Sequence, residues 1–175
     1  LTTGMRRGEL LALRWDDLDF ATGKLRIDKQ IYPVSGKLIL NEPKTKAANR
    51  TIILPPAMVE LLAEYKKGVF SELMFPSRIK PEQPIDPGYV RKRHQVILER
   101  AGCKRVRFHD LRHTFATLSL ENGMDVKTLS TIIGHVSAAT TLNTYTHITD
   151  EMRKQAALSI DQGIAKAEVE PMSEQ

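Results

Sequence analysis

The chain has 175 residues, of which 41% are hydrophobic, and this is enough for one globular domain with a buried core. Its single cysteine excludes a disulfide framework within the chain, and no apolar run approaches the roughly 20 residues of a membrane span. The net charge is +5, and residues 148–175 contribute three basic and six acidic side chains, a net of −3, so residues 1–147 carry +8. A basic body of this kind favours a polyanionic partner, most simply nucleic acid.

The first elements in chain order are predicted to be a helix and a small sheet. Residues 5–15 carry leucines at helical positions, and residues 16–23 are typical of a turn region. Strand character follows in residues 24–32, in residues 37–40 after a Pro-to-Gly turn, and in residues 50–55, where two prolines end the run. The sequence therefore predicts a small three-stranded antiparallel sheet near the N-terminus.

The remainder is predicted to be helical apart from one loop, so the expected fold class is α+β and mainly α-helical. Residues 70–87 hold four prolines and are predicted to be that loop. The Asn-Gly pair at 122–123 is a good C-terminal cap. Helices are predicted over residues 57–67, 88–101, 109–123, 125–135 and 137–148, and from Thr149 through a tail with Met152, Ala156, Ile160 and Ile164 at four-residue spacing.

The segment HDLRH, residues 109–113, contains the first candidate site. His109 and His113 are four residues apart and share a helix face, as in the H-E-x-x-H pattern of zinc peptidases with Asp in place of Glu. Arg112 lies on the face of His109, and a fixed cation beside a divalent ion is unfavourable. An anion suits this pair better, because a guanidinium can bond two phosphate oxygens at once.

Two further segments carry residues of the same chemistry. TGMRRGELLALRW, residues 3–15, places Arg6 after a Thr-Gly turn at the expected start of a helix. Gly134 and His135 are followed ten residues later by Tyr145. Two arginines, two histidines and a tyrosine can carry out phosphoryl transfer without a metal.

The chain resembles the tyrosine recombinases, also called the phage-integrase family, in three segments that match in order and in spacing. These segments are TGMRRGELLALRW, HDLRHTFATLSLENG and IIGHVSAATTLNTYTH. The resemblance runs from residue 2 to about 148 and looks most like integrases of conjugative transposons and temperate phages. It implies a catalytic domain over residues 1–148, with the first helix of that domain missing, and a tail helix with an acidic end over residues 149–175. Because such proteins carry DNA-binding domains ahead of this one, and the chain begins without Met, we expect a piece of a longer protein.

The resemblance also implies roles for individual residues. Lys44, in PKTK, matches the family's hairpin lysine, with Lys46 as a near competitor, and His113 is expected to support structure. The implied catalytic residues are Arg6, Lys44, His109, Arg112, His135 and the nucleophile Tyr145, with Glu9 in a supporting position.

The implied activity is site-specific recombination of double-stranded DNA through a 3′-phosphotyrosyl intermediate, for integration and excision of a mobile element. We expect it to need no metal, ATP or other cofactor. The expected assembly is a homo-oligomer on DNA, a tetramer with tails exchanged between protomers, in the bacterial cytoplasm and without membrane contact. The alternatives are a type IB topoisomerase, an inactive DNA-binding relative and a zinc hydrolase.

Overall fold

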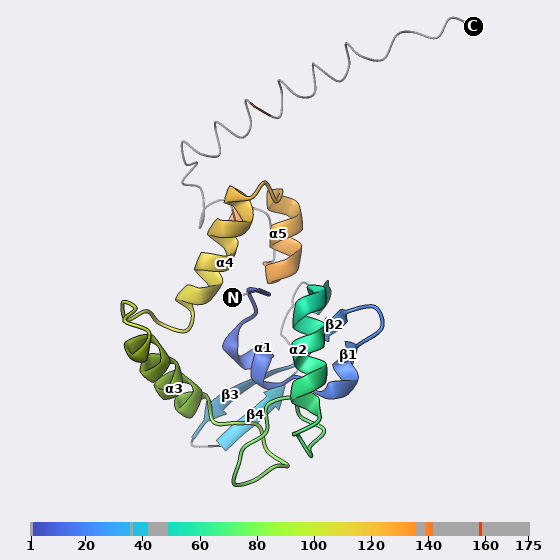
Figure 1. Ribbon diagram of the computed structural model, residues 1–175, viewed down its shortest axis with the longest axis vertical. Coiled ribbons are helices and arrows are strands. Elements are labelled where there is room, and N and C mark those ends of the chain that lie inside the picture. Colours follow the sequence, from blue (N-terminus) through green and yellow to red (C-terminus); the bar gives the residue numbers. More distant parts are fainter. Residues whose placement is uncertain (1, 36, 42–48, 136–138, 142–157, 159–175) are drawn as a thin grey trace, which may run out of the picture.

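The computed structural model describes residues 2–35, 37–41, 49–135, 139–141 and 158, and these form an α+β fold of the predicted class (Figure 1). In Figure 1 the sheets and α2 occupy the lower half, α4 and α5 lie above them, and the N-terminal segment runs between the two halves. The elements in chain order are α1 (Arg7–Leu11), the 3-10 helix η1 (Trp15–Asp17), β1 (Leu18–Asp19), β2 (Lys24–Ile27), β3 (Gln30–Val34), β4 (Lys37–Asn41), β5 (Arg50–Ile53), α2 (Pro56–Lys66), α3 (Pro87–Arg100), α4 (Asp110–Glu121) and α5 (Val126–Ile133).

The three-stranded antiparallel sheet is present, but its strands differ in part from the prediction. Its order is β1-β2-β5, and β3 pairs with β4 in a separate two-stranded sheet. The segment 24–32, predicted as one strand, is broken at Asp28 and Lys29, whose side chains bond to each other at 2.7 Å. β3 continues through Pro33, which pairs with Leu38 where a turn was expected.

The first helix is much shorter than residues 5–15, and that part of the prediction is wrong. After Ala12 the backbone leaves the helix and pairs with the proline-rich loop, since Met74 donates to the Leu13 carbonyl and Trp15 donates to the Glu72 carbonyl, both at 3.0 Å. Leucine periodicity cannot reveal this pairing, because the partner residues lie about sixty positions further along the chain.

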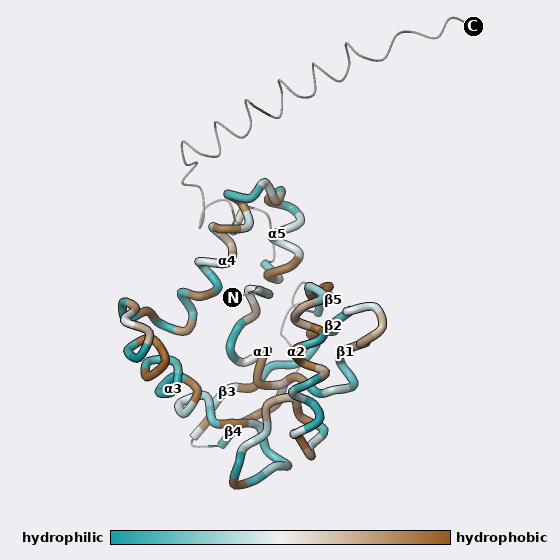
Figure 2. Tube along the Cα trace, in the orientation of Figure 1, coloured by the Kyte–Doolittle hydropathy of each residue, from teal (hydrophilic) through white to brown (hydrophobic). Residues whose placement is uncertain are grey.

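The later helices agree with the sequence prediction. α2, α3, α4 and α5 fall where helices were expected, and no helix or strand occurs between α2 and α3. Figure 2 shows alternating hydrophobic and hydrophilic bands along α3 and α4, as expected for helices with one packed face. Residues 139–141 are helical, whereas the rest of the predicted helix 137–148 and the tail, apart from Leu158, lie outside the described residues.

Three hydrophobic clusters fix the relative positions of these elements. The largest lies between the three-stranded sheet and α2 and includes Trp15, Leu25, Ile27 and Met74. A second joins α4 to α5 through Ala116, Leu120, Leu129 and Ile133. The third packs α1 against β3 and α3 through Leu11, Ala12 and Ile31. None of the helices in the described part of the chain has the length and apolar character that crossing a membrane requires.

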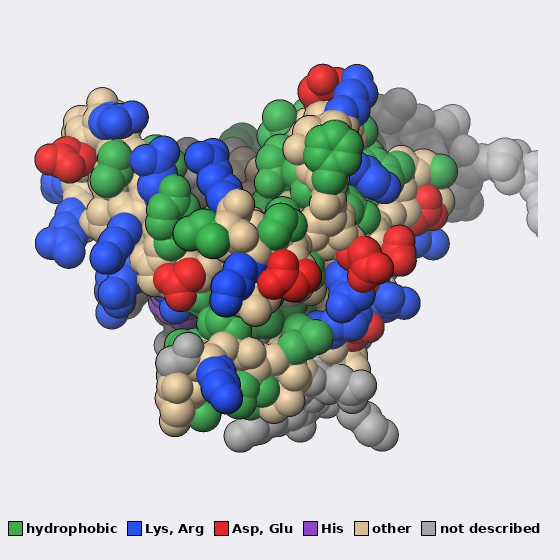
Figure 3. All heavy atoms as spheres, turned by 90° about the horizontal axis from the view of Figure 1, so that it is seen from below, with side chains coloured by type: hydrophobic (Ala, Val, Ile, Leu, Met, Phe, Trp, Pro, Cys, Tyr) green, Lys and Arg blue, Asp and Glu red, His purple; other side chains and the backbone are tan. Residues whose placement is uncertain are grey.

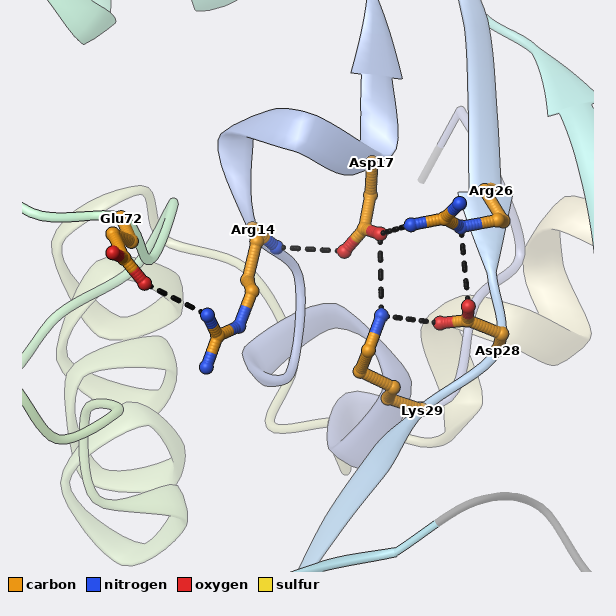
Figure 4. Close-up of polar contacts among 6 residues, drawn as sticks. All are labelled: Arg14, Asp17, Arg26, Asp28, Lys29 and Glu72. Carbon is orange, nitrogen blue, oxygen red and sulfur yellow. Dashed lines mark hydrogen bonds and ion pairs between the residues drawn. The ribbon is translucent and has the colours of Figure 1, made fainter.

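A polar cluster around Asp17 secures the break between β2 and β3 (Figure 4). The Asp17 carboxylate accepts from the Arg14 backbone N–H at 2.9 Å, from Arg26 at 2.8 Å and from Lys29 at 3.3 Å. Burial would raise the pKa of Asp17, but these donors outweigh it and hold the pKa below its ordinary value. η1, β2 and the start of β3 are therefore joined through one buried carboxylate.

The contact between α1 and β3 generates a prediction for Gly8. A Cβ at this position would lie 2.5 Å from the backbone oxygen of Ile31, which cannot move without shifting β3. Gly8→Ala should therefore destabilise the fold by about 1–3 kcal/mol, although alanine is the better helix former. Urea unfolding measures this, with Gly68→Ala as the matched control, because a Cβ there meets nothing closer than 3.8 Å. Equal stability of the two variants would contradict the close packing.

Candidate active site

Arg6 is held at the start of α1 by a residue in the first turn of the same helix. Its backbone N–H donates to Oε2 of Glu9 at 2.9 Å, and its guanidinium donates to Oε1 at 2.8 Å. The Glu9 side chain is 1% exposed and that of Arg6 is 37% exposed. The carboxylate thus anchors Arg6 from beneath while part of the guanidinium faces solvent.

Two hydrogen bonds bring Arg112 and the turn before His135 to the N-terminal segment that carries Arg6. Arg112, on the buried face of α4, donates to the Gly4 carbonyl at 2.8 Å. Arg6 donates to the carbonyl of Gly134, just before His135, at 3.3 Å. Segments more than a hundred residues apart in sequence therefore meet around the first residues of the chain.

His109 occupies the position immediately before α4, and its ring contacts that of His113 edge to face, with centroids 4.9 Å apart. The pKa of His109 is lowered by burial and then by electrostatic interaction with the neighbouring His113, Arg112 and Arg6. His109 is therefore favoured in its neutral form, in which one ring nitrogen can accept a proton.

His135 lies at the end of α5 and is partly buried. Its Nδ1 is 2.9 Å from the hydroxyl oxygen of Thr141, which is fully buried. Burial, followed by the charges of Arg112 and Arg6, lowers the pKa of His135 to about 4. The geometry agrees, because the carbonyl of Gly134, the residue before His135, accepts from Arg6 at 3.3 Å. At neutral pH its imidazole is uncharged, with Nδ1 engaged by Thr141.

Arg50 is a component of the site that the sequence analysis missed. It begins β5, and its guanidinium donates to both carboxylate oxygens of Glu9, at 2.8 and 3.2 Å. Burial would raise the pKa of Glu9, but hydrogen bonds and charge from Arg50, together with those from Arg6, hold the pKa below its ordinary value. A signal was present in the sequence, because strand alternation places Arg50 on the same face as the buried Ile52.

A basic groove with a volume of about 1110 Å³ adjoins the site. It runs along α3 and the segment before α4, and His109 forms part of its wall. Figure 3 shows Lys and Arg side chains gathered on the α3 side of the molecule, to the left of the view. The basic residues that line the groove are Arg7, Arg91, Lys92, Arg105 and Arg107.

The structure thus brings together Arg6, Glu9, His109, Arg112 and His135 from the predicted set. Lys44, its competitor Lys46 and Tyr145 lie outside the described residues. Within the residues that the structure describes, no group of three or more His, Cys, Asp or Glu side chains is placed to hold a metal ion. The described part of the site has the chemistry of an anion-binding centre, with fixed guanidinium groups and neutral imidazoles.

A protein-family model described as "Phage integrase family" matches residues 1–152. The tyrosine recombinase XerC-like protein of Caldanaerobacter subterraneus subsp. tengcongensis is 31% identical to this chain, over 91% of the chain and 46% of its own length. The ICEBs1 integrase of Bacillus subtilis is 27% identical to this chain, also over 91% of the chain and 46% of its own length.

Solved structures have the same fold. The Tn1549 transposon integrase in complex with circular intermediate DNA superimposes with a TM-score of 0.73 at 24% identity, over 91% of this chain and 56% of that one. The crystal structure of XerA recombinase gives a TM-score of 0.69 at 27% identity, over 90% of this chain and 54% of that one.

The lowered pKa of His135 predicts how stability depends on pH. The pKa in the fold, about 4, lies below the ordinary value of 6.5, so the unfolded chain takes up the proton first. The contribution of His135 is complete above about pH 6.5 and is lost as the pH falls toward 4. His135→Gln should therefore lose less stability than the wild type between pH 6.5 and 4.5 in urea unfolding.

The control is Thr131→Ala in α5, which removes no titratable group and should therefore follow the pH dependence of the wild type. If His135→Gln and the wild type lose stability equally over this interval, then His135 is not held neutral by its surroundings.

Proposed function

The chain belongs to the phage integrase family, and we propose that it is the catalytic part of a site-specific DNA recombinase. It spans about half the length of the curated relatives named above. The proposed reaction cuts and rejoins double-stranded DNA through a 3′-phosphotyrosyl intermediate, for integration and excision of a mobile element. One observation carries the proposal, which is that Arg6 bonds the Gly134 carbonyl beside His135, while Arg112, three residues after His109, bonds the Gly4 carbonyl beside the start of α1.

Arg6, Arg112 and His135 are the proposed stabilisers of the charge that develops on the non-bridging phosphate oxygens. Arginine suits this role because its planar fork can donate two hydrogen bonds and keeps its charge. A neutral imidazole adds one N–H donor, and a phosphate beside it would favour its protonation. Donors fixed before the substrate arrives stabilise a transition state without reorganising, and losing one typically costs about 3–4 kcal/mol.

Tyr145 is the proposed nucleophile. Its hydroxyl oxygen attacks phosphorus and forms the phosphotyrosyl bond while the bond from phosphorus to the 5′-oxygen breaks. His109 is the proposed acceptor of the tyrosine proton, in keeping with a lowered pKa that leaves it neutral. Lys44 is the proposed donor of a proton to the departing 5′-oxygen. The new bond conserves the free energy of the old one, so religation needs no ATP.

Double-stranded DNA is the proposed substrate, and the basic groove beside His109 is the proposed path of its backbone. Three solved relatives are described as DNA complexes: the Tn1549 integrase with circular intermediate DNA, XerH recombinase with its difH substrate and the lambda integrase dimer at a core site. Phosphate contacts made by lysine and arginine should give an affinity that falls steeply with salt. The proposed setting is the bacterial cytoplasm, on DNA.

The covalent step is tested with a nicked duplex that traps the phosphotyrosyl product, using the protein at its full natural length in a buffer that contains EDTA. The wild type should form an adduct stable to denaturation, because the arginines supply the positive charge that a metal would otherwise provide. Tyr145→Phe should abolish the adduct, because phenylalanine has no hydroxyl oxygen to bond to phosphorus.

The matched control is Tyr89→Phe, which removes a hydroxyl from α3 outside the site and should react like the wild type. An adduct that persists in Tyr145→Phe, or one that requires added zinc, would overturn the assignment.

We further propose that the protein acts as a tetramer on DNA and that residues 149–175 pack against a neighbouring protomer. The sequence places Met152, Ala156, Ile160 and Ile164 at four-residue spacing, and such a stripe is stable only when another surface covers it. The tail carries a net charge of −3 and the body +8, which favours contact between tail and body at low salt.

Replacing Ile160 and Ile164 with Asn should therefore weaken assembly on DNA, measured by gel shift and analytical ultracentrifugation, at least 10-fold. Cleavage at a single site should change far less, because the stripe makes no contact with the reacting phosphate. The control, Gln162→Ala, alters a tail position that is not three or four residues from any member of the stripe. Unchanged assembly and recombination in the double variant would mean that the tail packs on its own domain.

A further inference from the structure

We propose that Arg50 is a positioning residue of the reaction, because its buried guanidinium joins the anchor of Arg6 to the turn that carries His135. This inference rests on the proposed function, and it concerns a residue, Arg50, whose own side chain does not reach the substrate. The Arg50 side chain is 4% exposed, so it cannot donate to a phosphate outside the protein. Any effect on the reaction must pass through the groups that it holds.

The first connection runs to Glu9 and from there to Arg6. Arg50 bonds both oxygens of the Glu9 carboxylate, and the same two oxygens accept from the guanidinium and backbone N–H of Arg6. The carboxylate is therefore fixed from two sides. The Glu9 side chain can rotate only by breaking its bonds to Arg50. The position of the Arg6 guanidinium therefore depends on Arg50, which lies 41 residues after Glu9 in the sequence.

The second connection runs to the end of α5. The Nε of Arg50 donates to the Ile132 carbonyl at 2.6 Å. Gly134 has a left-handed backbone with φ of 68°, and a Cβ there would lie 2.8 Å from Nη1 and 3.0 Å from Cζ of Arg50. The turn before His135 thus packs closely against the Arg50 side chain, and both this contact and the positive φ require a glycine at position 134.

One rigid group therefore determines the spacing between Arg6 and His135. A guanidinium offers five N–H donors in a fixed plane, and here they bond a carboxylate on α1 and a carbonyl on α5 at once. A lysine ammonium keeps the charge but is a point donor without a planar surface for Gly134. Preorganised donors lose much of their effect when displaced, and an error of about 1 Å can cost roughly 100-fold in rate.

The Asp17 cluster supplies a matched control for the general effect of altering an arginine on a buried carboxylate. Arg26 donates to Asp17, whose side chain is 3% exposed, at 2.8 Å, and its second ion pair is with Asp28 (Figure 4). Arg26→Lys changes the same chemical group beside a similarly buried acid. Because the Arg26 side chain is 56% exposed and that of Arg50 is 4% exposed, Arg26→Lys controls for the changed pairing with a buried acid, and thermal unfolding compares the stability of the two variants.

The experiment compares Arg50→Lys with Arg26→Lys and the wild type in the full-length protein. Single-turnover cleavage of the nicked duplex should fall about 100-fold in Arg50→Lys and less than threefold in Arg26→Lys. DNA affinity should stay within threefold of the wild type in both variants, because neither arginine is part of the basic groove. Thermal unfolding at the assay pH verifies that each variant is folded during the measurement.

A second readout does not depend on cleavage. In protein with isotope-labelled histidine, the ring resonances of His135, assigned with His135→Gln, should shift in Arg50→Lys and stay unchanged in Arg26→Lys. His94 serves as the internal reference in both spectra. A merely structural role for Arg50 would lower the unfolding temperature without moving His135 in the folded state.

Cleavage by Arg50→Lys within threefold of the wild type, or a His135 signal that does not move, would overturn the positioning role. If the wild type itself formed no adduct, the proposed function would fail, while the His135 shift would still decide whether Arg50 positions this turn. The two failures are therefore distinguishable.

Discussion

The site depends on one buried carboxylate. Glu9 is almost fully inaccessible to water, and an isolated charge in such a place would be strongly unfavourable. It remains ionised because Arg6 and Arg50 both donate to it, and these donors come from α1 and β5. Pairing this charge requires the start of the chain, the sheet and the turn after α5 to occupy one arrangement, since Arg50 also bonds the Ile132 carbonyl. The geometry of the candidate centre therefore follows from the need to pair the buried Glu9 carboxylate.

The two arginines near the histidines determine the electrostatics of the candidate centre above Glu9. Arg6 and Arg112 bring positive charge close to His109 and His135, and together with burial this keeps both imidazoles neutral. Fixed guanidinium groups beside neutral imidazoles make a centre that favours an anion. The hydroxyl of Thr141 engages Nδ1 of His135 and leaves the other ring nitrogen directed elsewhere. The basic groove beside His109 extends the same electrostatic preference along the molecule.

The rest of the fold supports this centre by fixing its three contributing parts. α1 ends early because residues 13–15 pair with the proline-rich loop, and the resulting single turn packs so tightly on β3 that only glycine fits at position 8. α4 and α5 pack together through their own apolar cluster, and Arg112 on α4 bonds the N-terminal segment. β5 presents Arg50 to the interior because its neighbours on the same face are buried. Each arginine is thus supplied by a different packed unit.

The sequence by itself determined the later helices, the family and the identity of most candidate residues, because periodicity, caps and spaced motifs are local signals. Arg6, His109, Arg112 and His135 are recognisable from short segments, and Asn122 and Gly134 mark helix ends that the structure retains. Only the tertiary structure decided that α1 is one turn long, that residues 24–32 divide between two sheets, and that Arg50 completes the site. These outcomes depend on partners far along the chain, such as Glu72 for Trp15 and Glu9 for Arg50. Local propensity carries no information about which distant backbone or buried charge a residue will meet.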